Sequence, residues 1–150
     1  MARTSRKAAV MQQEAAPVTP ERIYHTAAYV RLSVEDNNRA GNHESIAMQQ
    51  YMLETYIEGQ PDMMLREVFS DNGESGTDFA RPGFERMMDS VRNREIDCIV
   101  VKDLSRFGRN YVETGYYLEK IFPYLGVRFV AVNDQYDTEN PKEGNELVLS

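Results

Sequence analysis

The sequence has few of the residues from which disulfides and metal sites are built. Its 150 residues contain a single cysteine, Cys98, and two histidines. One cysteine cannot form an internal disulfide, and Cys98 lies in the apolar run IDCIVV, where we expect a small core side chain. The histidines and the cysteine are scattered and do not have the spacing of a metal site, so we expect no metal. The lack of a disulfide framework indicates a reducing compartment, and we expect the protein in the cytoplasm.

Long apolar runs and an excess of positive charge are also lacking. No run approaches the ~18 apolar residues of a transmembrane helix, and residues 1–20 lack the apolar centre of a secretory signal. We therefore expect no membrane partner. The net charge of −7 argues against a chain that holds nucleic acid by bulk charge, so any polyanion must be bound by a local cluster. The phosphate-binding pattern G-x-x-x-x-G-K-[ST] is missing, so nothing predicts an NTPase.

The chain divides into two regions of different composition. Residues 1–22 are mostly small and polar, and we expect a disordered N-terminal arm. Residues 23–150 have the length of one domain, which buries roughly 70% of its extended-chain surface. The final segment GNELVLS has the pattern of a helix that is beginning, so we expect this chain to be a fragment of a longer protein.

Apolar runs with strand character alternate with amphipathic helical segments. The predicted strands are Thr26–Leu32, Leu65–Ser70, Ile96–Val101 and Val127–Val132. The predicted helices are Ser45 to about Glu58, Pro82 to Arg92 and Tyr111 to about Leu125. Ser45 or Asn42 is expected to cap the first helix, and Pro82 suits a first turn. Pro123 is expected to end or kink the last helix, and Gly126 suits its C-cap.

This alternation predicts an α/β fold with a mainly parallel central sheet and helices on both faces, a flavodoxin-like layering. Ligands of such sheets bind beyond the carboxyl ends of the strands. Arg31 and Ser33 end the first predicted strand, and Asp71 ends the second. The third strand leads into the segment KDLSRFGRN, residues 102–110. We therefore expect the functional site to lie among these residues.

Four arginines are expected near that edge of the sheet. Tyr29, Arg31 and Ser33 alternate along the first strand and share one face. An arginine in a central parallel strand is costly unless it meets an anion, although an edge strand with one wet face would also accept it. Arg81 follows the Gly-rich loop DNGESGTDF and precedes a helix, where it gains nothing from the helix dipole and is either functional or a surface charge.

Arg106 and Arg109 flank Gly108, which permits close approach of the backbone. Guanidinium groups bind phosphate oxygens through paired hydrogen bonds and stay charged. Several of them around one serine suit phosphoryl transfer without a metal, with the arginines stabilising charge on the phosphate and the serine attacking. No histidine is well placed, so a Ser-His-Asp hydrolase is not favoured.

Five motifs, in this order, resemble one known family. They are Tyr29-x-Arg31-x-Ser33, Ser45-Ile46-x-x-Gln49, Asp71 followed by Ser75-Gly76, Arg81-Pro82-Gly83-Phe84, and Leu104-Ser105-Arg106-Phe107-Gly108-Arg109. The pattern is similar to the resolvase/invertase catalytic domain of serine site-specific recombinases, and most similar to the large serine recombinases of integrative and transposable elements. The resemblance covers about Ile23 to Ser150 and implies a resolvase-like fold.

The resemblance implies a role for each matched residue. Ser33 would attack a DNA phosphodiester and form a 5′-phosphoserine, with strand exchange and religation to follow. The residues that would hold the scissile phosphate are Arg31, Arg81, Arg106 and Arg109. The supporting residues would be Tyr29, Ser45, Gln49, Asp71, Ser75 and Ser105. The reaction would need no ATP, metal or other cofactor, and the implied partners are duplex DNA recombination sites and further copies of the full-length protein in a homodimer or tetramer.

One position departs from the family pattern. Smaller resolvases have an aspartate before the arginine matched by Arg106, whereas Ser105 stands here. Asp103 lies two residues earlier and is the candidate to replace that aspartate in part. Two alternative functions remain open from the sequence: a resolvase-like module that assembles or regulates without cleaving, and a flavodoxin-like domain that binds a phosphorylated small molecule.

Overall fold

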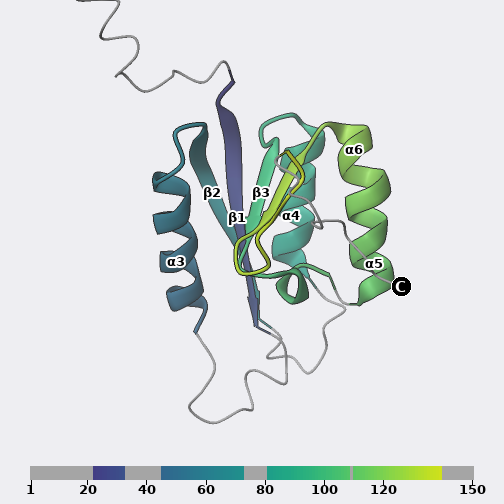
Figure 1. The fold of residues 1–150 in the computed structure, drawn as a ribbon. Coiled ribbons are helices and arrows are strands. Elements are labelled where there is room, and N and C mark those ends of the chain that lie inside the picture. The colour runs from purple at the N-terminus through teal and green to yellow at the C-terminus, as the bar shows by residue number, and fades with distance from the viewer. Residues whose placement is uncertain (1–21, 33–44, 73–80, 109, 140–150) are drawn as a thin grey trace, which may run out of the picture.

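A five-stranded sheet forms the centre of the computed structural model, which describes residues 22–32, 45–72, 81–108 and 110–139. The strand order is β2-β1-β3-β4-β5. The first four strands pair in parallel, and β5 is antiparallel to β4. Helices cover both faces, with α3 on one side and α4, α5 and α6 on the other (Figure 1). The predicted fold class is therefore confirmed.

The strands lie close to where the apolar runs place them. Their bounds are β1 Tyr24–Leu32, β2 Met63–Asn72, β3 Cys98–Val101, β4 Arg128–Ala131 and β5 Tyr136–Asp137. The predicted second strand is too short, because β2 continues through Asp71 while paired with Arg31 of β1. Strand β5 was not predicted, since a two-residue strand has no periodicity in the sequence.

The helices begin and end where the capping residues indicate. Helix α3 spans Ile46–Glu58, and the side chain of Ser45 caps it by accepting a hydrogen bond from the backbone nitrogen of Met48. Helix α4 spans Pro82–Arg92, with proline in the first turn as predicted. The helix α5, Tyr111–Tyr116, is capped by Asn110.

The last predicted helix is continuous but not uniform. A π-helical segment η3, Tyr117–Ile121, joins α5 to α6, Phe122–Leu125. The backbone nitrogen of Phe122 donates to the carbonyl of Tyr117, which is the wider i→i+5 turn. Pro123 then occupies the first turn of α6, where its missing N–H costs little. Gly126 ends the helix with a left-handed φ of 73°, as its C-cap position predicts.

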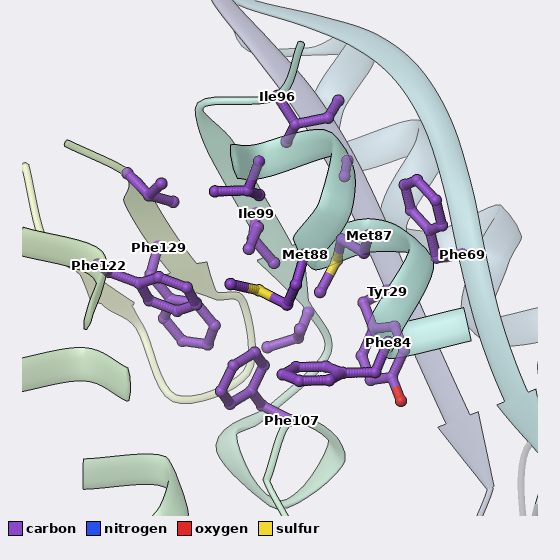
Figure 2. Close-up of a cluster of buried hydrophobic side chains, with 14 of the residues drawn as sticks. Tyr29, Phe69, Phe84, Met87, Met88, Ile96, Ile99, Phe107, Phe122 and Phe129 are labelled. Atoms are coloured by element: carbon purple, nitrogen blue, oxygen red, sulfur yellow. The ribbon is translucent and has the colours of Figure 1, made fainter. Parts of the chain in front are cut away.

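Two hydrophobic cores fill the space between the sheet and its helices. The larger core packs α4 and the α5–α6 helical run against one face of the sheet, and Figure 2 shows Phe84, Phe107 and Tyr29 among its rings. The smaller core lies under α3. Cys98 belongs to this smaller core, is fully buried as predicted, and has its pKa raised to about 12 by burial. No helix in the described part of the chain has both the length and the apolar character needed to cross a bilayer.

Candidate active site

The candidate site lies where β1 and β3 end, at the point where the order of the sheet reverses. After β1 the chain builds β2 on one side, and then crosses to β3 on the other. The carboxyl ends of the strands diverge at such a switch point and leave room for a ligand. A cavity of about 740 Å³ lies here, and residues that line it include Arg31, Asp103, Ser105, Asn110, Thr114 and Asp134. This cavity lies at the edge of the sheet where the sequence predicted a functional site.

Arg31 extends from the end of β1 toward the turn that follows β3. Its side chain is largely buried, and Nη2 donates to the backbone carbonyls of Ser105 at 3.2 Å and Gly108 at 3.5 Å. Gln49 of α3 is fully buried beneath it and places Nε2 3.5 Å from the carbonyl oxygen of Arg31. The helix on one face of the sheet and the turn beyond its edge therefore both hold the end of β1.

The turn after β3 is a short 3₁₀ helix, η2, at Leu104–Arg106. Asp103 caps this helix, because its Oδ1 accepts hydrogen bonds from Ser105 Oγ at 2.6 Å and from the backbone nitrogen of Arg106 at 3.1 Å. Asp134 accepts from the backbone nitrogen of Leu104 at 2.7 Å. The aspartate two residues before Ser105 thus contacts the hydroxyl that stands where smaller resolvases have an acid.

Gly108 allows this turn to pack directly on the first turn of α5. A Cβ atom at Gly108 would lie 2.1 Å from Oγ1 of Thr114 and 3.1 Å from its backbone nitrogen. These distances are shorter than van der Waals contact, so any side chain would push the turn away from α5. The close approach that the sequence indicated at Gly108 is an approach to the protein's own helix.

Asp71 connects the end of β2 to β1 and α4. Its carboxylate accepts from the backbone nitrogens of Gly83 at 2.7 Å and Phe84 at 2.9 Å, and from the hydroxyl of Tyr29 at 2.7 Å. It therefore caps the N-terminus of α4 from a neighbouring strand, where the helix dipole favours a negative charge. Gly83 is required for this approach, since a Cβ there would lie 2.2 Å from the carbonyl oxygen of Ser70.

Tyr29 remains protonated in this environment. Burial raises the pKa of its hydroxyl well above the ordinary value of 10.0, and the hydrogen bond to Asp71 acts in the same direction, while the charge of Arg81 opposes the shift. The neutral hydroxyl can therefore donate to Asp71 and accept from Nε of Arg81, which lies 3.4 Å away.

Arg81 points inward from the N-cap position of α4. Its Nη1 forms an ion pair with Glu113 of α5 at 2.9 Å, and its Nη2 donates to the carbonyl oxygen of Phe107. Its guanidinium carbon lies 4.0 Å from the centroid of the Phe84 ring. Its side chain is only 5% exposed. The guanidinium is thus engaged by protein groups, and a contact with phosphate would require at least one of them to be exchanged.

The remaining predicted residues fall into two groups, two that the structure describes and three that it does not. Ser45 is the cap of α3, and Arg106 lies at the end of η2, half-buried. Ser33, Ser75 and Arg109 lie outside the described residues.

Glu113 and Asn110 were not predicted from the sequence. An asparagine directly before a helical pattern is a recognised capping signal that could have revealed Asn110. Within the described ranges, histidine, cysteine and carboxylate side chains do not gather in threes as metal ligands do.

Comparison with known proteins gives the family. A model of the resolvase N-terminal domain matches residues 26–149. Among curated proteins, no match is found. The chain belongs to the resolvase family, and its matched region includes all five motifs.

Solved structures with the same fold include an integrase and recombinases. The N-terminal catalytic domain of TP901-1 integrase is 26% identical with a TM-score of 0.65, covering 77% of this chain and 82% of that domain. The C-terminal catalytic domain of ISC1926 TnpA, an IS607-like serine recombinase, is 25% identical with a TM-score of 0.57, covering 72% and 69%. A resolvase family site-specific recombinase from Streptococcus pneumoniae shares the fold at 23% identity, with a TM-score of 0.64 and coverage of 81% and 80%.

Proposed function

We propose that this chain is the catalytic domain of a serine site-specific recombinase that cuts and rejoins duplex DNA. The observation that carries the proposal is the position of Arg31. It stands at the end of β1, on the wall of the cavity, and bonds to the turn that carries Ser105 and Arg106. Ser33 follows two residues later in the sequence, directly after the last residue of β1.

The proposed chemistry is a transesterification. The hydroxyl oxygen of Ser33 attacks the phosphorus of a DNA phosphodiester, the bond from phosphorus to the 3′ oxygen breaks, and a 5′-phosphoserine forms. The serine loses its proton and the departing 3′ oxygen gains one, so the reaction consumes no net proton. Religation reverses these steps, and the energy of the phosphodiester is kept in the phosphoserine.

Arginines supply the charge that this reaction needs. Arg31, Arg106 and Arg109 are proposed to contact the phosphate oxygens, since a guanidinium stays charged and binds oxygens in pairs. Arg81 is proposed to belong to the same group, with its present protein contacts exchanged or shared. Tyr29, Gln49, Asp71, Ser75 and Ser105 are proposed to support them. Ser45 contributes by setting the start of α3, the helix that carries Gln49.

The proposed partners are duplex recombination sites and further copies of the full-length protein, and the proposed compartment is the cytoplasm. Four large apolar or aromatic side chains are exposed along the α5–α6 helical run, and exposed side chains of this kind are compatible with self-association. They are Tyr111, Val112, Tyr116 and Tyr124.

The test is covalent capture. The full-length protein is incubated with a nicked recombination site that traps cleavage, and we expect an adduct at a 5′ DNA end that survives denaturation. Ser33→Ala should still bind the site but give no adduct, whereas Ser105→Ala should retain some. Failure of the wild-type protein to form any adduct would favour an assembly module that does not cleave.

A further inference from the structure

Arg81 is the point at which four parts of the fold meet. Its guanidinium contacts Tyr29 of β1, the carbonyl of Phe107 after η2, and Glu113 of α5, while its own backbone begins α4. All three guanidinium nitrogens are used, and the ring of Phe84 covers one of its faces. Figure 2 shows Tyr29, Phe84 and Phe107 grouped at this end of the core. A buried cation in this position needs a charged partner to offset its desolvation.

Glu113 provides that charge. Its backbone nitrogen donates to the side chain of Asn110, which fixes the first turn of α5. Its carboxylate folds toward the core, with its side chain 19% exposed, and lies 2.9 Å from Nη1 of Arg81. A glutamate whose only task was to complement the helix dipole would be solvated, so its inward position indicates a second task.

That second task concerns the turn between η2 and α5. Arg81 donates to the carbonyl of Phe107, and the neighbouring carbonyl of Gly108 accepts from Arg31. Gly108 in turn packs against Thr114, the residue after Glu113. The orientation of the turn that carries the candidate phosphate ligands therefore depends on Arg81, and the orientation of Arg81 depends on Glu113.

We propose that Glu113 is a positioning residue for DNA cleavage, acting through Arg81 on the turn at residues 105–108. The proposal rests on the proposed recombinase function. Glu113 touches neither the substrate nor the reacting atoms in this scheme. It fixes the guanidinium that aligns the carbonyls of Phe107 and Gly108, and through them the relation of Arg31 to the turn.

Loss of this alignment should slow the chemical step more than it weakens DNA binding. Misplacement of catalytic groups by about 1 Å can cost on the order of 10²-fold in rate. Glu113→Ala, which removes the whole carboxylate, should lower the cleavage rate by that order. Glu113→Gln keeps an acceptor oxygen and loses only the charge, so we expect a loss of about tenfold.

The experiment uses the full-length protein and the trapped-cleavage DNA site. Single-turnover adduct formation at saturating protein gives the cleavage rate, and a gel-shift titration of the same site gives the dissociation constant. Glu119→Gln is the matched control, because Glu119 is an exposed acid farther along the same helical run. Arg81→Gln and the double variant Arg81→Gln/Glu113→Gln complete a double-mutant cycle, and thermal melting checks that each variant is folded.

The positioning role predicts slow cleavage by Glu113→Gln, a dissociation constant within about twofold of the wild-type value, and wild-type behaviour of Glu119→Gln. In the Arg81→Gln background, Glu113→Gln should cause no further loss, since its route of action is already removed. Cleavage by Glu113→Gln at or above the wild-type rate, or losses that add fully in the double variant, would overturn the proposal. A wild-type protein that forms no adduct would instead refute the proposed function itself.

Discussion

Asp71 should be among the most costly polar residues to remove from this domain. Its carboxylate receives two backbone N–H bonds from the start of α4 and the hydroxyl bond of Tyr29, all between 2.7 and 2.9 Å. Replacing a capping side chain by alanine costs about 1 kcal/mol. The buried hydroxyl of Tyr29 would also lose its acceptor, at about 1–3 kcal/mol. For Asp71→Ala we therefore expect the free energy of unfolding to fall by about 3 kcal/mol.

Two further variants separate these contributions. Asp71→Asn keeps one acceptor oxygen for the helix but presents an NH₂ group on the other side, so we expect a loss of about 1.5 kcal/mol. Tyr29→Phe removes only the hydroxyl, leaves the helix cap intact, and should cost about 1 kcal/mol. Urea denaturation followed by circular dichroism measures all three. A loss below about 1 kcal/mol for Asp71→Ala would refute the view that Asp71 anchors α4 to the sheet.

Three other predictions concern the rest of the fold. Gly83→Ala should destabilise the domain by more than about 2 kcal/mol in the same denaturation assay, because the added Cβ would lie 2.2 Å from a backbone oxygen. The control Gly59→Ala should be nearly neutral, because the nearest atom to its added Cβ would be 3.5 Å away. Burial raises the pKa of Cys98 from 9.0 to about 12, so its protonated thiol contributes stability that is complete below pH 9.0 and is lost as the pH rises toward 12. At pH 10 the free energy of unfolding of the wild type should have fallen by about 1 kcal/mol more than that of Cys98→Ala, and equal losses would contradict this. Arg128→Ala should cost about 3 kcal/mol, since Asp62 and Asp137 would lose a shared buried cation, yet the folded variant should cleave DNA at the wild-type rate because these residues lie at the opposite ends of the strands.

The fold could be predicted from the sequence wherever a repeating pattern of apolar residues spans several turns or strand residues. The apolar run around Ile99 placed β3 to within two residues, because a fully buried strand is apolar on both faces. The spacing of Phe84, Met87 and Val91 placed α4 correctly, because one face of this helix is buried. The strand β5 has only two residues, and the side chain of Arg128 in β4 forms an ion pair with Asp137 across this antiparallel pair. A long-range ion pair of this kind leaves no local trace in the sequence.

The candidate site was predictable in location but not in its internal contacts. The predicted strand ends and the predicted parallel sheet were sufficient to place Arg31 and Ser105 at the same edge of the sheet, where the structure shows them in contact. The inward direction of Arg81 was not predictable, because it depends on Glu113, which is 32 positions away in the sequence. The hydrogen bond between Asp103 and Ser105 was likewise hidden, since spacing alone does not fix the direction of a side chain before a 3₁₀ turn.

The central claim is that Ser33 carries the covalent bond to DNA, and peptide mapping of the trapped adduct tests it most directly. Trypsin cuts after arginine and lysine, so Ser33 lies in the peptide Leu32–Arg39 and Ser105 in the separate peptide Asp103–Arg106. After nuclease treatment, mass spectrometry should find the residual nucleotide on Leu32–Arg39, with fragmentation assigning it to Ser33. A nucleotide on Asp103–Arg106, or on any other peptide of the chain, would contradict the account.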